Sequence, residues 1–184
     1  MATAFSLDQF TPDLNDSQQR RLAQGEVVLN GQLGDYTAWA IAQASPPTVW
    51  DVLTDYEGFP QFLPSVISSK VTERAGNRTV VARRDRRKIG FMPIKVKIVT
   101  ENIEVNQERI DYRMLSGTLD SLEGVWRLAP LDPVGDAPRT LLVQMIEAKA
   151  SMGPLQKYFY EVFEKGLVDT LGSLRTEMER RALH

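Results

Sequence analysis

The side chains best suited to chemistry lie within apolar, strand-like segments. In LLVQMIEAKA, strand alternation separates Gln144 from Glu147, and we expect one of these two polar groups to face inward. An inward Glu147 would have a raised pKa and act as a general acid or base. The alternative is that Glu147 lies near the strand end, where it reaches water or pairs with an arginine.

A second candidate is the basic run RRDRRK, in which five cations surround Asp85. On a strand these side chains alternate between faces. Either Arg83 and Arg87 or Arg84 and Arg86 therefore point to the concave side, where they would meet an anionic or carbonyl group of a ligand. The alternative is a solvated edge whose cations pair with acidic neighbours, as Asp85 within the run suggests.

Aromatic residues are the third candidate set. Tyr112 and Trp126 fall on neighbouring predicted strands, and a cavity between them would let the Tyr O–H or the Trp N–H orient a ligand. Tyr112 is also a candidate acid or base. Phe159 and Phe163, in the C-terminal segment, are candidate apolar ligand contacts. For each aromatic residue, packing in the core is the competing interpretation.

The segment between two predicted strands contains Phe91 and Met92, with cations on both sides. Apolar residues between cations suit the boundary of an anionic membrane, so peripheral membrane contact through Phe91 and Met92 is one hypothesis. A lid at a pocket mouth is another, because Met adapts to varied ligands. In the third alternative, Phe91 and Ile94 fold back onto the protein.

Composition excludes several classes of protein. The net charge of −2 disfavours a nucleic-acid binder, and the absence of Cys removes disulfides and thiolate chemistry. The only His is the last residue, His184, so a Ser-His-Asp triad and a His-ligated zinc site are not expected. We therefore predict no metal and no cofactor. The start of the chain does not resemble a signal peptide, and no apolar run is long enough to span a membrane, which predicts a cytoplasmic protein.

The order of elements predicts a single α+β domain at 25–184, preceded by an appendage at 1–24 with a short helix between Thr11-Pro12 and Gly25. Ser45 followed by two prolines predicts the start of the first of two short helices. A long amphipathic helix is predicted from Met152 to about Arg181. The predicted strands number about seven, with a further contribution from 26–33, and cover 37–44, 65–73, 78–89, 93–105, 108–115, 121–131 and 139–151.

Two phrases carry a resemblance to a known family. VWDVLTDYEGFPQFLP (49–64) and GTLDSLEGVWRL (117–128), in this order of elements, resemble the START-like (helix-grip, SRPBCC) superfamily. Within it the chain is most similar to the polyketide cyclase/dehydrase and coenzyme-Q-binding group. The resemblance implies a curved antiparallel sheet wrapped around the C-terminal helix, with a ligand pocket between them.

Two functions follow as expectations. The first is binding or transport of a hydrophobic small molecule such as a lipid, a prenylated quinone or a polyketide-like compound. The second is an aromatase/cyclase or dehydratase that uses a cavity carboxylate or tyrosine as its acid or base. The lack of a His before residue 184 weakens the enzymatic alternative.

Overall fold

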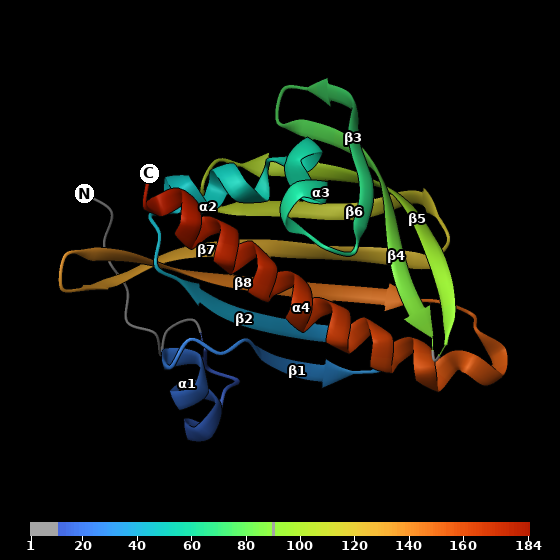
Figure 1. Cartoon of the computed structure of the whole chain (residues 1–184), viewed down its shortest axis with the longest axis horizontal. Helices are drawn as coiled ribbons and strands as arrows, with labels where there is room; N and C mark the ends of the chain where they lie inside the picture. Colours follow the sequence, from blue (N-terminus) through green and yellow to red (C-terminus); the bar gives the residue numbers. More distant parts are fainter. Residues whose placement is uncertain (1–10, 90) are drawn as a thin grey trace.

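A computed structural model of the chain describes residues 11–89 and 91–184, and its fold is α+β. An antiparallel sheet curves around one long helix (Figure 1). The helical elements are α1 (Asp16–Ala23), α2 (Pro46–Leu53), the 3-10 turn η2 (Tyr56–Gly58), α3 (Phe59–Phe62), the 3-10 turn η3 (Gly153–Leu155) and α4 (Gln156–Ala182). The strands are β1 (Val28–Gln32), β2 (Asp35–Ala42), β3 (Val66–Ala75), β4 (Arg78–Ile89), β5 (Met92–Val105), β6 (Arg109–Gly117), β7 (Ser121–Val134) and β8 (Ala137–Lys149).

The sheet has eight strands in the order β1-β2-β8-β7-β6-β5-β4-β3. Strands β3 to β8 form a meander of neighbours, as expected for short connections between antiparallel strands. Strand β2 then pairs with β8, and β1 adds the eighth strand, within the 26–33 segment from which the sequence predicts a further contribution. The predicted helix-grip class is confirmed.

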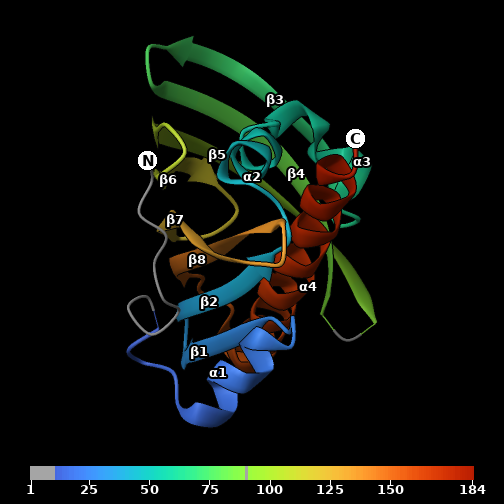
Figure 2. The same cartoon turned by 90° about the vertical axis from the view of Figure 1, so that its left-hand side faces the viewer.

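Helix α4 crosses the concave face of the sheet (Figures 1 and 2). It has 27 residues, so it is roughly 40 Å long at 1.5 Å per residue and reaches across the whole sheet. Leu171, Leu174 and Met178 on its inner side are almost completely buried. This burial, rather than helix propensity alone, fixes α4 on the sheet.

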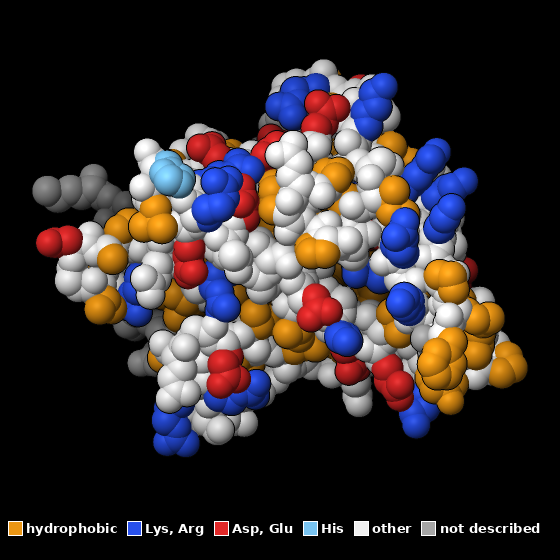
Figure 3. All heavy atoms as spheres, viewed as in Figure 1, with side chains coloured by type: hydrophobic (Ala, Val, Ile, Leu, Met, Phe, Trp, Pro, Cys, Tyr) orange, Lys and Arg blue, Asp and Glu red, His pale blue; other side chains and the backbone are white. Residues whose placement is uncertain are grey.

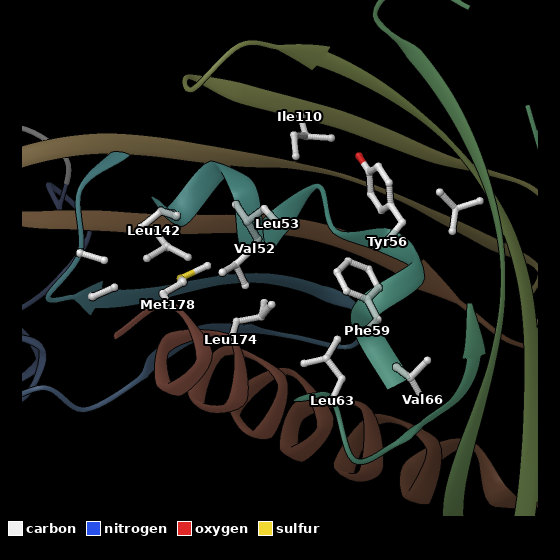
Figure 4. Packing of buried hydrophobic residues seen from close by; sticks show 14 residues of the cluster. Val52, Leu53, Tyr56, Phe59, Leu63, Val66, Ile110, Leu142, Leu174 and Met178 are labelled. Carbon is white, nitrogen blue, oxygen red and sulfur yellow. The ribbon is translucent and has the colours of Figure 1, made fainter. Parts of the chain in front are cut away.

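Helix α2 begins where the sequence predicts. The side chain of Ser45 accepts a hydrogen bond from the Thr48 backbone N–H, and Pro46 occupies the first turn. Val49, Val52 and Leu53 are buried, whereas Trp50, which the sequence also places on this face, is half-buried. Together with η2 and α3, the helix packs an apolar cluster onto the C-terminal half of α4 (Figure 4). The cluster closes one end of the space between sheet and helix.

Helix α1 starts later than Thr11-Pro12 predicts. Its N-cap is Asn15, which forms a reciprocal capping box with Gln18, and this pairing satisfies two backbone N–H groups at the helix start. Leu22 is buried against the face of the sheet opposite α4, in a second cluster that includes Trp39. Residues 1–10 of the predicted appendage lie outside the described residues.

Candidate ligand cavity

A cavity of about 180 Å³ lies between α4 and strands β4 to β8. Most of its wall is apolar. From the sheet, Val81, Ile94, Val96, Ile98, Ile110, Trp126 and Ile146 contribute, and from α4, Phe159, Val162, Phe163, Leu167 and Leu174. The described part of the wall also includes a few polar side chains, carried by strands and by Thr170 of α4. A mostly apolar wall with few polar groups is typical of a site for a hydrophobic ligand, and the volume, below the roughly 300–1,000 Å³ of most ligand sites, fits a compact molecule or one end of a longer one.

One polar group is formed by Tyr112 of β6 and Gln144 of β8. The Gln144 amide Nε2 donates to the Tyr112 hydroxyl at 3.0 Å, and both side chains are more than 90% buried. Gly124 of β7 lies between them: a Cβ at this position would come within 2.5 Å of the Tyr112 hydroxyl. The glycine therefore makes the room in which these two side chains meet across β7.

This pair retains hydrogen-bonding capacity toward the cavity. Gln144 Oε1 is buried and has no partner among the described residues. The Tyr112 hydroxyl is protonated at neutral pH, as tyrosine ordinarily is, and burial raises its pKa further, so it can donate a hydrogen bond. The pair thus presents one free donor and one free acceptor to a ligand.

The second polar group is an Arg83–Asp85–Arg87 triad on the cavity face of β4. Asp85 is only 3% exposed. Its Oδ1 lies 2.9 Å from Arg83 Nε and its Oδ2 lies 3.6 Å from Arg87 Nη2. Because one carboxylate faces two guanidiniums, the triad carries a net charge of +1 inside a largely apolar wall.

The triad is incompletely satisfied. Although Arg83 Nε and Asp85 Oδ1 form an ion pair, they are not aligned for a hydrogen bond. Both atoms lack a hydrogen-bond partner among the described residues. A buried ion pair offsets its loss of hydration only when its remaining donors and acceptors are also bonded. The triad can therefore donate one further hydrogen bond from Arg83 Nε and accept one at Asp85 Oδ1.

Arg87 reaches from the sheet to α4. A Cβ on Gly166 would lie 3.4 Å from Arg87 Cζ, so the guanidinium rests against the helix at its glycine. Burial lowers the pKa of Arg87, while neighbouring Asp85 opposes that shift. The cavity is thus crossed near this point by a cationic side chain that the helix accommodates only because residue 166 is small.

Glu147 does not face the cavity, which corrects the hypothesis of an inward glutamate. On β8, Gln144 and Ile146 line the cavity, so alternation turns Glu147 to the opposite face. There its carboxylate is half-exposed and lies 2.6 Å from the Lys149 ammonium. Of the two polar residues on this strand, the inward one is Gln144.

Phe91 and Met92 do not line the cavity either. They lie at the end of the β4–β5 hairpin, where Phe91 is fully exposed and Met92 is 56% exposed. Phe91 does not fold back onto the protein, so that alternative is wrong for Phe91, whereas Ile94 points inward and lines the cavity. The residue before them, Gly90, lies outside the described residues. By contrast, the remaining candidate ligand contacts all border the cavity: Arg83, Arg87, Tyr112, Trp126, Gln144, Phe159 and Phe163. Their role in binding stays a prediction.

Three residues that shape this site were not named as site residues from the sequence: Asp85, Gly124 and Gly166. Asp85 had a visible signal, because it alternates with Arg83 and Arg87 and must share their face. The two glycines had no such signal in the sequence, because their role depends on which side chain approaches them from another element.

Within residues 11–89 and 91–184, no group of three or more Asp, Glu, His or Cys side chains is placed to hold a metal ion. No helix in the same ranges is both long and apolar enough to cross a membrane.

Several solved structures share this fold. A protein from Thermus thermophilus is 23% identical, with a TM-score of 0.63 over 79% of this chain and 97% of its own. The ZhuI aromatase/cyclase of a Streptomyces species is 17% identical, with a TM-score of 0.63 over 85% and 96% of the two chains. A STAR-related lipid transfer protein from Xanthomonas axonopodis is 14% identical, with a TM-score of 0.57 over 83% and 92%.

Sequence comparison gives a narrower result. The model of the family "polyketide cyclase / dehydrase and lipid transport" matches residues 42–175. This range runs from the end of β2 well into α4 and includes every polar residue of the cavity described above. No curated protein sequence matches the chain.

Proposed function

This chain belongs to the polyketide cyclase/dehydrase and lipid transport family, and from that premise we propose that it binds a hydrophobic small molecule between the sheet and α4. The observation that carries the proposal is the cavity itself: a mostly apolar wall with polar side chains on the neighbouring strands β4, β5 and β6 and on β8. Burial of apolar ligand surface, at roughly 25 cal/mol per Å², supplies most of the binding free energy. Lipids, prenylated quinones and polyketide-like compounds are the candidate ligands.

The polar groups define one end of the ligand. The two positive charges of Arg83 and Arg87 exceed the single negative charge of Asp85 between them. This excess of positive charge favours a ligand with an anionic or carbonyl head. Tyr112 and Gln144 offer a donor and an acceptor to the same molecule. We therefore propose an amphiphile with an apolar body and one oxygen-rich end.

Two measurements test this function. Mass spectrometry of organic extracts from the purified protein is expected to detect a co-purifying hydrophobic compound. Fluorescence titration with cis-parinaric acid, a fatty acid that fluoresces when bound, is expected to saturate, and its methyl ester is expected to bind more weakly. If neither an extracted compound nor saturable binding of either probe is found, the proposal fails.

The head-group assignment has a matched control on one strand. Arg83→Gln is expected to weaken parinaric acid binding about tenfold or more, the effect of losing a hydrogen bond to a charged group. Arg84→Gln, one residue away on the opposite face of β4, is expected to leave binding unchanged. Equal affinities for the two variants would contradict a role for Arg83.

A cyclase or dehydratase is the second candidate, favoured by one observation. The Tyr112 hydroxyl is buried in the cavity wall and bonded to Gln144, so it is placed to donate a hydrogen bond to a carbonyl oxygen of a bound ketone, although its raised pKa makes it a weak proton donor. Incubation with linear poly-β-ketone thioesters and product analysis by mass spectrometry tests this activity. Turnover that Tyr112→Phe abolishes while probe binding persists would favour the enzyme over the carrier.

A further inference from the structure

The β4–β5 hairpin presents a face composed of cations. Its inner residues, among them Ile89, Ile94 and Val96, line the cavity. Its outer face holds Arg84, Arg86 and Lys88 from β4, and Lys95 and Lys97 from β5. We call these five residues the basic face. Figure 3 shows Lys and Arg side chains grouped on the right of the molecule, where Figure 1 places β4 and β5.

Strand register brings these cations together. Arg84 pairs directly with Lys97, and Arg86 pairs directly with Lys95. Like charges in opposite positions of an antiparallel pair destabilise the sheet. None of the five forms an ion pair with a residue in the described ranges. The chain as a whole has a net charge of −2, so this face is a local exception that the fold itself does not require.

The end of the same hairpin is apolar. Phe91 and Met92 extend beyond the basic face into solvent, and the side chain of Phe91 buries none of its apolar surface against the protein. Single exposed apolar residues are common and carry no meaning by themselves. Their position next to five unpaired cations is more specific, because cations with an adjoining apolar tip match the headgroup and acyl layers of an anionic bilayer.

The length of the hairpin sets its orientation. Lys97 is six residues from Phe91, which is roughly 20 Å along an extended strand. If the hairpin stood upright on its tip, Lys97 would lie beyond the Debye length of about 8 Å at physiological salt and would not sense the surface. A tilted hairpin brings Lys95 and Lys97 close to the headgroups and leaves Phe91 in contact with the acyl boundary.

We propose that the basic face and the Phe91–Met92 tip form a docking surface for an anionic lipid bilayer. The tip enters the interface, and the five cations contact lipid phosphates and carboxylates. Since the cavity lies on the other face of the same two strands, docking brings the cavity wall next to the membrane. The proposal does not depend on which ligand the cavity holds.

Co-sedimentation with vesicles tests the docking surface on the full chain. The wild type is expected to bind vesicles that contain phosphatidylserine at low salt, to bind them less at high salt, and to ignore pure phosphatidylcholine. At about 1 kcal/mol for each cation near an anionic surface, Lys95→Glu/Lys97→Glu is expected to reduce binding at least roughly 30-fold. Phe91→Ser, which removes apolar insertion, is expected to reduce it about tenfold.

A charge-matched control uses cations elsewhere. Arg20→Glu/Arg127→Glu changes the net charge equally but lies on α1 and β7, so its binding is expected to equal that of the wild type. The proposal is overturned if the wild type does not bind the anionic vesicles, or if the two double variants bind alike. Binding to duplex DNA without binding to vesicles would also overturn it, in favour of a nucleic-acid surface. Parinaric acid titration of the same variants keeps this result separate from cavity function.

Discussion

The guanidinium of Arg87 rests on Gly166 of α4, the helix position at which a Cβ would lie 3.4 Å from Arg87 Cζ. This contact joins the cationic strand β4 to the helix that covers the cavity. It limits the size of residue 166, because a side chain larger than that of alanine would occupy the space of the guanidinium.

Substitutions at Gly166 are expected to separate stability from binding. Gly166→Ala adds a methyl group at ordinary contact distance and improves helix propensity, so the free energy of unfolding is expected to rise by up to about 1 kcal/mol with probe binding retained. Gly166→Leu displaces Arg87 and is expected to weaken parinaric acid binding. Gly172→Ala, at a position with no neighbour within 4 Å, is the control that gains helix propensity alone. Equal probe affinity in the Ala and Leu variants would show that Arg87 does not contact the head group.

Gly124→Ala is expected to disrupt the cavity wall. Its new Cβ would lie 2.5 Å from the Tyr112 hydroxyl and 2.3 Å from the Met145 carbonyl oxygen, and the backbone oxygen cannot move aside cheaply. Overpacking of this kind costs about 1–3 kcal/mol. Urea denaturation followed by fluorescence measures this cost. A free energy of unfolding equal to that of the wild type would mean that β6 and β7 are less tightly packed here than the structure indicates.

Asp85→Asn is expected to destabilise the apo protein and to increase its response to anions. Removing the carboxylate leaves two partly exposed guanidiniums without their counter-ion in a mostly apolar wall, which costs about 1–3 kcal/mol. An anionic ligand would then replace the missing charge. Thermal unfolding should therefore show a lower Tm than the wild type without ligand, and a larger rise in Tm on addition of parinaric acid. A rise no larger than that of the wild type would argue against an anion near the triad.

The C-terminal end of α4 is expected to make stability sensitive to acid. Hydrogen bonds from Arg180, and in addition from Arg181, lower the pKa of Glu177 to about 2. Because the folded-state pKa lies below the ordinary value, this contribution is complete above about pH 4.5 and disappears as the pH falls toward 2. Glu177→Gln should lower the free energy of unfolding near pH 7 by about 2 kcal/mol.

The difference between Glu177→Gln and the wild type should shrink as the pH falls from about 4.5 to 2. Denaturation curves at several pH values measure it. A difference that stays constant over this range would assign the loss to packing rather than to charge.

The sequence by itself determined the elements and the closure of the cavity. Ser45 with Pro46 starts α2, and the apolar spacing from Phe159 to Met178 makes a helix that must bury one side. Alternation also determined that Arg83, Asp85 and Arg87 share one face of a strand and Arg84, Arg86 and Lys88 share the other.

Only the tertiary structure determined which face of β4 lines the cavity and which face points outward. Strand pairing sets the phase of β4, because a shift of one residue exchanges its faces, and no local pattern in a run of arginines fixes that phase. The same pairing set Lys95 and Lys97 opposite two arginines and so created the basic face. It also brought Tyr112 of β6 and Gln144 of β8 together over Gly124 of β7. The two polar side chains can meet there because the glycine has no side chain, and neither polar residue signals this contact by itself.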